Sequence, residues 1–276
     1  MPLVKQFVDF PFGMLAYIKV GQGGEPIVFL HGIPTSSFMW RRVLDELALT
    51  RTCYALDMLG YGDSDKPADR DLSVAAQAEY LNAWADGLGI APFHLVGHDI
   101  GGGVAQQLAV RQPRRVKSLV LVDSICYDSW PEPNIARLKE PSWDATLRAR
   151  DLRPGFRRAM EAGMVHKERV TDEVVEGYVA PFLGQAGRQA YLRCARALDA
   201  RDTLSIAADV EKLDIPTRVL WGQHDPYQKL EYGQRLARSM RRASLEVCPD
   251  GGHFLPEDCP DWVAQQIRAW VSGTIP

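Results

Sequence analysis

The residue with the clearest chemical potential is Asp99, which lies in the sequence GHDIGG (Gly97 to Gly102). A predicted buried strand, Phe93 to Val96, leads into these glycines, and a helix is predicted to follow them. Such a sharp turn requires small neighbours and makes its central side chain project into a site. A carboxylate with an ordinary pKa of about 3.9 is already ionised at neutral pH. Asp99 can therefore attack a saturated carbon without a base, forming an alkyl ester that water must cleave. The simpler alternative is that Asp99 only caps the helix.

Two further residues could cleave that ester. Asp225 comes just after the predicted strand Thr217 to Trp221, and His253 lies in a glycine-rich loop after the strand Ser244 to Val247. We predict that neutral His253 activates water and that Asp225 fixes its tautomer. Asp123, at the end of another strand, is the alternative orienting acid. The order nucleophile, acid and histidine is typical of hydrolases with a strand-to-helix nucleophile turn.

Hydrolysis of the ester builds negative charge on an oxygen of Asp99, and backbone N–H groups must already point there. We assign this oxyanion hole to the backbone amides of Ile33 and Ile100, one from each loop. His31 is predicted to be structural. His98 either tunes the site or packs beside it.

Short strand-like segments alternate with longer amphipathic segments, which favours a mostly parallel sheet covered by helices. We predict an α/β fold with an eight-stranded sheet, in which residues 1–124 and 214–276 form the core domain. The strand and helix alternation stops from about 125 to 213, which we predict to be a helical cap over the carboxyl edge of the sheet. The strands that can be placed are Leu15 to Val20, Pro26 to Leu30, Thr52 to Asp57, Phe93 to Val96, Ser118 to Val122, Thr217 to Trp221 and Ser244 to Val247.

The composition narrows the classes of partner. The 276 residues include 32 Lys and Arg against 35 Asp and Glu, a net charge of −3, so nucleic acid is not expected as a partner. The five cysteines form no C-x-x-C pair, which argues against disulfides and a zinc site. With no signal peptide or membrane segment in the sequence, we expect a cytoplasmic monomer or homodimer. The expected partner is a small-molecule substrate, with no metal and no cofactor.

The chain resembles the α/β-hydrolase superfamily over nearly its full length, and within it the haloalkane dehalogenase and epoxide hydrolase branch with an aspartate nucleophile. The motifs that carry this resemblance are HGIPTSSFMWR (31–41), DMLGYGDSDKP (57–67), GHDIGG (97–102), WGQHD (221–225) and GGHFLPED (251–258). The predicted cap is only weakly matched. The resemblance implies a hydrolase with the triad Asp99, His253 and Asp225.

The same resemblance leaves the substrate open. Haloalkane dehalogenases typically have Asn and Trp side chains to hold the halide where Ile33 and Ile100 stand here, so Trp130 and Trp143 would have to replace them. Fluoroacetate dehalogenases usually have arginines just after the nucleophile, and this chain has none there.

Epoxide hydrolases use cap tyrosines to activate the ring oxygen. Tyr191, about 34 residues before Asp225, lies near where the later of these tyrosines is expected, and Tyr127 and Tyr178 are candidates for the earlier one only by proximity. We therefore favour an epoxide over a halide. The alternatives are ester or carbon–carbon bond hydrolysis, cofactor-free oxygenase or lyase chemistry, and a non-catalytic ligand-binding receptor.

Overall fold

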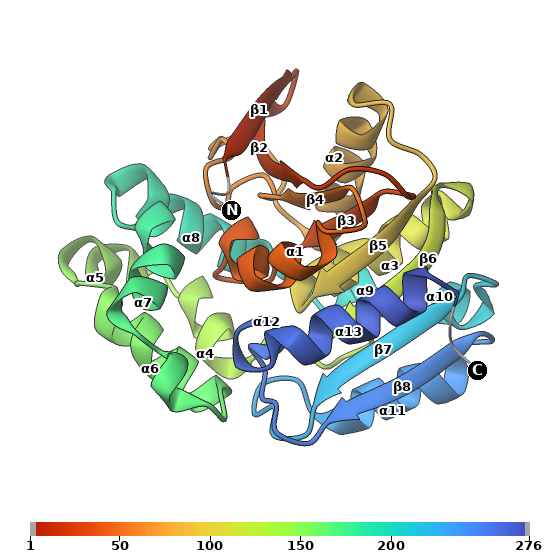
Figure 1. The fold of residues 1–276 in the computed structure, drawn as a ribbon. Helices are drawn as coiled ribbons and strands as arrows, with labels where there is room; N and C mark the ends of the chain where they lie inside the picture. The colour runs from red at the N-terminus through yellow and green to blue at the C-terminus, as the bar shows by residue number, and fades with distance from the viewer. Residues whose placement is uncertain (1–3, 274–276) are drawn as a thin grey trace.

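A computed structural model describes residues 4–273 as a sheet with helices on both faces and a group of helices at one end (Figure 1). The strands are β1 (Lys5–Phe10), β2 (Gly13–Val20), β3 (Ile27–Leu30), β4 (Cys53–Leu56), β5 (Phe93–His98), β6 (Val116–Val122), β7 (Thr217–Gly222) and β8 (Ala243–Cys248).

The eight strands form one sheet in the order β1-β2-β4-β3-β5-β6-β7-β8. Only the pairings of β2, with β1 and with β4, are antiparallel. Every residue of β3, β4 and β5 is buried, as expected for parallel strands covered on both faces. The predicted fold class is therefore confirmed. The sequence analysis did not place β1, because this edge strand has no fully buried residue and so lacks a clear apolar face.

The helices follow the sheet in a regular pattern. In Figure 1, α1 and α13 lie in front of the sheet and α3 and α11 lie behind it. The α-helices of the core are α1 (Arg41–Leu47), α2 (Val74–Gly87), α3 (Ile100–Arg111), α11 (Leu230–Ser239), α12 (Leu255–Asp258) and α13 (Pro260–Val271). The 3-10 helices there are η1 (Ser37–Trp40) and η2 (Pro113–Arg115).

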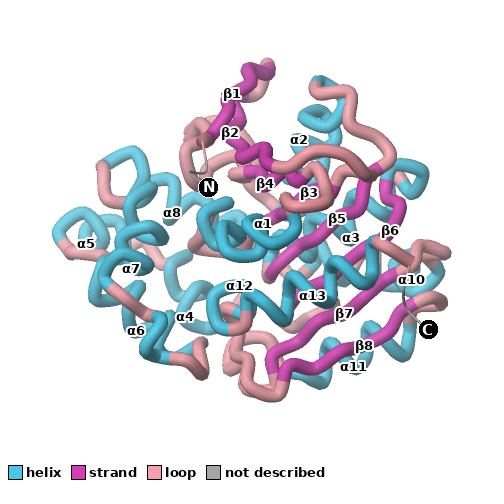
Figure 2. Tube along the Cα trace, in the orientation of Figure 1, coloured by secondary structure: helices cyan, strands magenta, loops and turns pink. Residues whose placement is uncertain are grey.

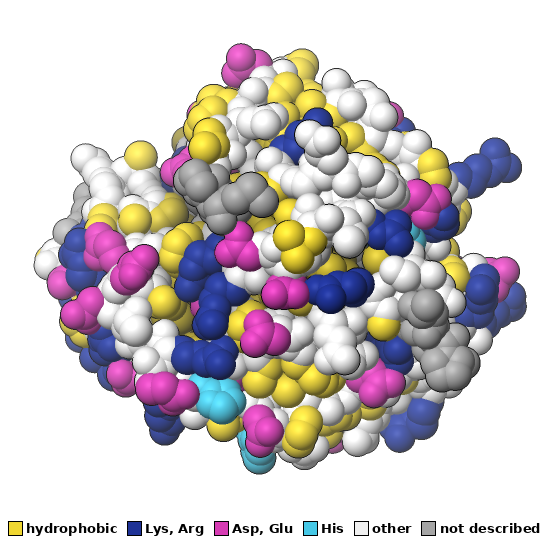
Figure 3. Space-filling model, in the orientation of Figure 1, with side chains coloured by type: hydrophobic (Ala, Val, Ile, Leu, Met, Phe, Trp, Pro, Cys, Tyr) yellow, Lys and Arg dark blue, Asp and Glu magenta, His cyan; other side chains and the backbone are white. Residues whose placement is uncertain are grey.

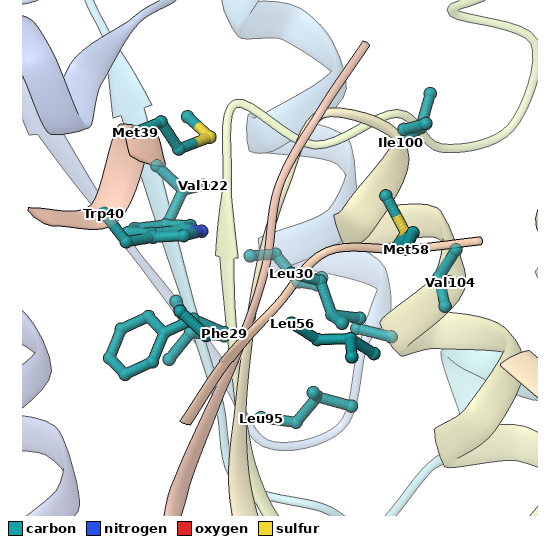
Figure 4. Packing of buried hydrophobic residues seen from close by; sticks show 14 of the residues in the cluster. Phe29, Leu30, Met39, Trp40, Leu56, Met58, Leu95, Ile100, Val104 and Val122 are labelled. Carbon is teal, nitrogen blue, oxygen red and sulfur yellow. The ribbon is translucent and has the colours of Figure 1, made fainter. Parts of the chain in front are cut away.

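The apolar core fills both faces of the sheet next to β5. Figure 4 shows Phe29 and Trp40 on one face, and Leu30, Leu56 and Val104 toward α3 on the other. All five side chains are at most 2% exposed. Burial of a large apolar side chain contributes on the order of 1.5–3 kcal/mol, so this packing holds β3 and β5 firmly in register. The carboxyl ends of these two strands carry the loops of Ile33 and Asp99.

Only helices and loops lie between β6 and β7 (Figure 2). They are α4 (Pro133–Ala136), η3 (Arg137–Lys139), α5 (Trp143–Ala149), α6 (Arg153–Gly163), η4 (Lys167–Arg169), α7 (Asp172–Val179), η5 (Ala180–Phe182), α8 (Gln185–Ala197), α9 (Arg201–Leu204) and α10 (Ala207–Lys212). Helices α4 to α8 gather at one end of the molecule, whereas α9 and α10 contact α3 of the core. That 125–213 is a separate cap domain remains a prediction.

One face of the molecule shows how charged and apolar side chains are distributed over it. The face in Figure 3 carries acidic and basic side chains side by side, with small apolar patches between them. Across residues 4–273, no helix is both long and apolar enough to span a bilayer.

Candidate active site

Asp99 lies at the turn from β5 into α3 in a conformation that non-glycine residues rarely adopt, with φ 51° and ψ −120°. Its carbonyl accepts the N–H groups of Gly102, at 3.0 Å, and of Ile125, at 3.2 Å, which fixes the turn. The carboxylate forms no cap bond to α3, so capping does not explain this residue. A Cβ on Gly32 would lie 2.7 Å from the Asp99 Cβ, so the opposite loop must be glycine there.

Backbone N–H groups surround the Asp99 carboxylate. The Ile33 N–H donates to Oδ2 at 3.0 Å, and the nearby backbone N–H of Ile100 also lowers the pKa of this carboxylate. Burial raises the pKa of Asp99 to about 6, against the opposing effects of His253 and of the two N–H groups. Asp99 is therefore still mainly ionised at neutral pH. The two amides lie where the sequence analysis expected the oxyanion hole.

The imidazole of His253 is held by Asp225, whose Oδ2 lies 2.9 Å from Nδ1. The other oxygen of Asp225 accepts the N–H groups of Tyr227, at 2.7 Å, and Gln228, at 2.9 Å, so the carboxylate cannot rotate freely. Burial lowers the pKa of His253, but the Asp225 and Asp99 carboxylates outweigh it and hold that pKa above its ordinary value.

The alternative acid, Asp123, does not contact His253 by any hydrogen bond in the described residues. Its Oδ1 accepts the Gly222 N–H at 2.8 Å, and its Oδ2 is buried without a partner among them. Burial, with the nearby Asp225 carboxylate, raises the pKa of Asp123 well above its ordinary value. The structure thus places the Asp225 carboxylate at the imidazole ring, and the Asp123 carboxyl nearby without a hydrogen bond to that ring in the described residues.

The two other histidines of this region, His98 and His31, contact backbone groups. The His98 Nε2 lies 2.8 Å from the carbonyl oxygen of His253, and burial lowers the pKa of His98 well below its ordinary value. The His31 Nε2 accepts the Met58 N–H at 3.1 Å, and burial lowers the pKa of His31 to about 4. Neither histidine lines the cavity described next, so His98 is not placed to bind a substrate.

A cavity of about 620 Å³ lies between the core and the helices that follow β6. Among the residues singled out from the sequence, those that line it are Ile33, Asp99, Ile100, Trp130, Trp143, Tyr178, Tyr191 and His253. Asp225 is not among the lining residues and contacts His253 on the side away from the cavity, while its role as the orienting acid stays a prediction. Within the described part of the chain, no cluster of three or more His, Cys, Asp or Glu side chains could hold a metal ion.

The two tyrosines that line the cavity differ in their hydroxyl groups. Tyr191 packs beside the rings of Phe156 and Phe182, with centroid distances of 6.1 and 5.4 Å, and its hydroxyl makes no hydrogen bond to a described residue. The Tyr178 hydroxyl is fully buried beside the Glu257 carboxylate, so only its ring faces the cavity. Burial raises the pKa of both phenols, which keeps them protonated.

Two of the aromatic candidates need correction. The Trp130 indole N–H donates to the Thr203 hydroxyl at 2.6 Å, so it is not available to a halide. The Tyr127 hydroxyl lies 3.2 Å from the Glu211 carboxylate, and its ring packs against Arg235 outside the cavity.

Trp143 remains available as an indole donor. It lines the cavity, with the Arg137 guanidinium 5.1 Å from the centre of its ring.

The sequence analysis missed two residues that support His253. The Tyr227 ring stands edge-on to the imidazole at 5.2 Å, and its hydroxyl donates to the Ala159 carbonyl of α6 at 2.8 Å. The Asp258 carboxylate accepts the N–H groups of Gly252, Val165 and His166, each at 2.8 Å. Both residues tie the histidine loop to the segment around α6. The position of Tyr227, two residues after Asp225, was the signal that could have found it.

Comparisons with known proteins agree with this arrangement. A family model described as alpha/beta hydrolase fold matches residues 25–260. A cis-3-alkyl-4-alkyloxetan-2-one decarboxylase from Shewanella oneidensis is 29% identical over 99% of this chain and 90% of its own. A haloalkane dehalogenase from Mesorhizobium japonicum is 28% identical over 95% and 89%.

Solved structures are also similar. The haloalkane dehalogenase DbeA from Bradyrhizobium elkani superposes with a TM-score of 0.86 at 26% identity, covering 98% of both chains. The epoxide hydrolase CorEH has a TM-score of 0.86 at 24% identity, covering 99% of this chain and 100% of its own, which supports a shared fold only.

Proposed function

Because this chain belongs to the alpha/beta hydrolase fold family, we propose that it hydrolyses a small, mostly apolar substrate through a covalent ester on Asp99. The chain is a hydrolase of the haloalkane dehalogenase and epoxide hydrolase branch. The observation that carries the proposal is the Asp99 carboxylate, which opens to the cavity together with His253 while backbone N–H groups hold it from behind. We favour an epoxide as the substrate.

In the first step, ionised Asp99 attacks a ring carbon of the epoxide, the carbon–oxygen bond breaks, and the ring oxygen takes a proton. Tyr191 supplies that proton in our proposal, because this residue lines the same cavity as Asp99 and its hydroxyl has no hydrogen-bond partner among the described residues. The buried cavity strengthens this proton donation, since little water competes with it.

In the second step, His253 takes a proton from water, and the resulting hydroxide attacks the carbonyl carbon of the ester. The ester bond to the substrate oxygen then breaks, which releases the diol and restores the Asp99 carboxylate, and the proton held by His253 returns through solvent to the Tyr191 phenolate. The N–H groups of Ile33 and Ile100 stabilise the charge that develops on the ester oxygen. Esterification removes the negative charge of Asp99, which is one of the causes that raise the pKa of His253. The imidazole therefore releases its proton more easily once the ester has formed, when a neutral base is required.

The cavity offers fewer hydrogen-bond donors to a departing halide than to an epoxide oxygen. Ile33 and Ile100 offer only backbone N–H groups, which already face the nucleophile, and the Trp130 N–H is held by Thr203. Trp143 is the one indole among these candidates that could still donate to a halide.

A second candidate is decarboxylation of an oxetan-2-one, which the similarity to the Shewanella oneidensis enzyme favours. Such a four-membered lactone also has a strained carbon–oxygen bond that Asp99 could attack. Loss of carbon dioxide would leave an alkene, so the products distinguish the two candidates.

Trapping the ester tests the proposal. His253→Gln protein is mixed with a terminal epoxide such as 1,2-epoxyhexane, and its intact mass is measured. We expect a mass increase equal to one epoxide, localised to the peptide that contains Asp99. The matched control is the double variant Asp99→Ala, His253→Gln, which should gain no mass. An unmodified His253→Gln protein, with a wild-type enzyme that turns the epoxide over, would contradict a covalent intermediate.

A further inference from the structure

Three arginines stand at the opening of the cavity. Arg137 of η3, Arg150 after α5 and Arg158 of α6 all line the cavity and are also exposed to solvent. Because each of these residues both lines the cavity and is exposed, we place the three side chains at its mouth. The deeper lining is apolar or aromatic, as with Leu138 and Phe156.

None of these three guanidinium groups has a hydrogen bond or ion pair with another described residue. Other arginines of the same segment are paired: Arg153 with Glu176 at 2.8 Å, and Arg196 with Asp144 at 2.7 Å. Arg188 donates to backbone carbonyls. The contrast is therefore between arginines elsewhere in the segment that bond to carboxylates or carbonyls and arginines at the mouth that bond to neither in the described residues. Of the mouth arginines, Arg137 contacts the Trp143 ring, at 5.1 Å.

The acids that line the same cavity are already engaged. The Glu132 carboxylate accepts N–H groups of Asn134, at 2.7 and 2.8 Å, and of Ile135 at 3.3 Å. The Asp151 carboxylate accepts the backbone and side chain of Arg153, at 3.1 and 3.2 Å. Neither acid forms an ion pair with a mouth arginine, so the mouth keeps three positive charges free to meet a ligand.

Building on the proposed function, we propose that the natural substrate is an apolar chain with a carboxylate at the end remote from the reacting carbon. The carboxylate would bind among Arg137, Arg150 and Arg158, because guanidinium groups pair with carboxylates in a forked geometry. The apolar chain would cross the cavity and bring its epoxide carbon to Asp99. Positive charge around a low-dielectric opening also attracts anions from solution.

A binding measurement with unreactive ligands tests this inference independently of catalysis. Undecanoate and undecanamide have the same chain length and differ in charge, and calorimetry gives the Kd of each. At low ionic strength we expect undecanoate to bind about tenfold more tightly, with the difference shrinking as salt is added. Equal affinities for the two ligands in the wild-type protein would overturn the inference.

Substitution locates the effect. In the triple variant Arg137→Gln, Arg150→Gln, Arg158→Gln, the preference for undecanoate should fall to within about threefold, while undecanamide binding is unchanged. Unchanged undecanamide binding also shows that the variant is folded. The matched control, Arg114→Gln, Arg238→Gln, Arg241→Gln, removes the same charge from exposed arginines outside the cavity lining and should keep the preference. If both triple variants lose the preference equally, net charge explains it and the mouth does not.

The kinetic counterpart separates this inference from the proposed function. With 10,11-epoxyundecanoate and its amide, the mouth variant should raise KM for the acid alone and leave kcat unchanged. Hydrolysis of both compounds with equal KM in the wild-type protein would keep the proposed function and overturn the carboxylate site. Carboxylate-selective binding without hydrolysis of either compound would keep the carboxylate site and overturn the proposed function.

Discussion

The two walls of the cavity are built differently. On the core wall, each side chain is fixed by the backbone or by a neighbouring side chain. Asp99 lies in a strained turn with the Ile33 N–H 3.0 Å from its carboxylate, and the Asp225 carboxylate holds His253 at 2.9 Å. On the opposite wall, Tyr191 and the mouth arginines have no hydrogen-bond partner among the described residues. We infer that the core wall provides the nucleophile and the base, and that the opposite wall provides the proton donor Tyr191 and selects the substrate.

The comparison is tested most strongly by the two acids of the core wall. Asp225→Asn should reduce ester hydrolysis by about 10²–10⁴-fold, because the amide cannot stabilise the imidazolium. Asp123→Asn should change it less than about threefold, since Asp123 makes no hydrogen bond to His253 in the described residues and an amide oxygen can still accept the Gly222 N–H. Steady-state kcat values with one epoxide check both variants. Equal losses would show that the two acids act together.

A smaller effect is expected on the opposite wall. Tyr191→Phe should slow epoxide opening by about 10–100-fold, because the ring oxygen loses its proton donor. Tyr178→Phe should leave the rate nearly unchanged, since that hydroxyl is buried beside Glu257. The rate of adduct formation in the His253→Gln background measures this step directly. A larger loss with Tyr178→Phe would reverse the assignment.

The rate of each step should depend on pH through a different group. Below the pKa of that group, the rate should fall by about tenfold per pH unit. Ester formation requires ionised Asp99, so it should fall as pH drops below about 6 in the wild-type protein. His253 opposes the raised pKa of Asp99, so in His253→Gln this limb should move to higher pH. Ester hydrolysis requires neutral His253 and should rise with pH. Rapid-quench measurements across pH 5–9 separate the limbs, and an ester-formation limb near the ordinary carboxylate value would contradict the buried nucleophile.

The core wall could be predicted from the sequence because each of its side chains follows a strand end in a short local motif. Asp99 and His253 each lie beside glycines, and the parallel sheet brings these loops to one edge. The position of Tyr227, two residues after Asp225, could have indicated that it packs near the imidazole, but its hydrogen bond to the Ala159 carbonyl of α6 joins residues 68 positions apart and could not be predicted.

The opposite wall could not be predicted in the same way, because its contacts join residues far apart in the sequence. The Trp130 indole N–H is not a free donor, because it donates to Thr203, 73 residues later in the sequence. The Tyr127 hydroxyl lies outside the cavity beside the Glu211 carboxylate, 84 residues later in the sequence. Which arginines remain unpaired also depends on which carboxylates the fold brings near them. Periodicity places such helices but not their partners.

The most direct test of the covalent route is a single turnover in ¹⁸O-labelled water, with the protein in excess over an epoxide that it hydrolyses. We predict that the new hydroxyl of the diol carries unlabelled oxygen from Asp99, and that the peptide containing Asp99 gains one ¹⁸O. Labelled diol with an unlabelled Asp99 peptide would mean that water attacks the substrate directly, which would contradict a nucleophilic Asp99.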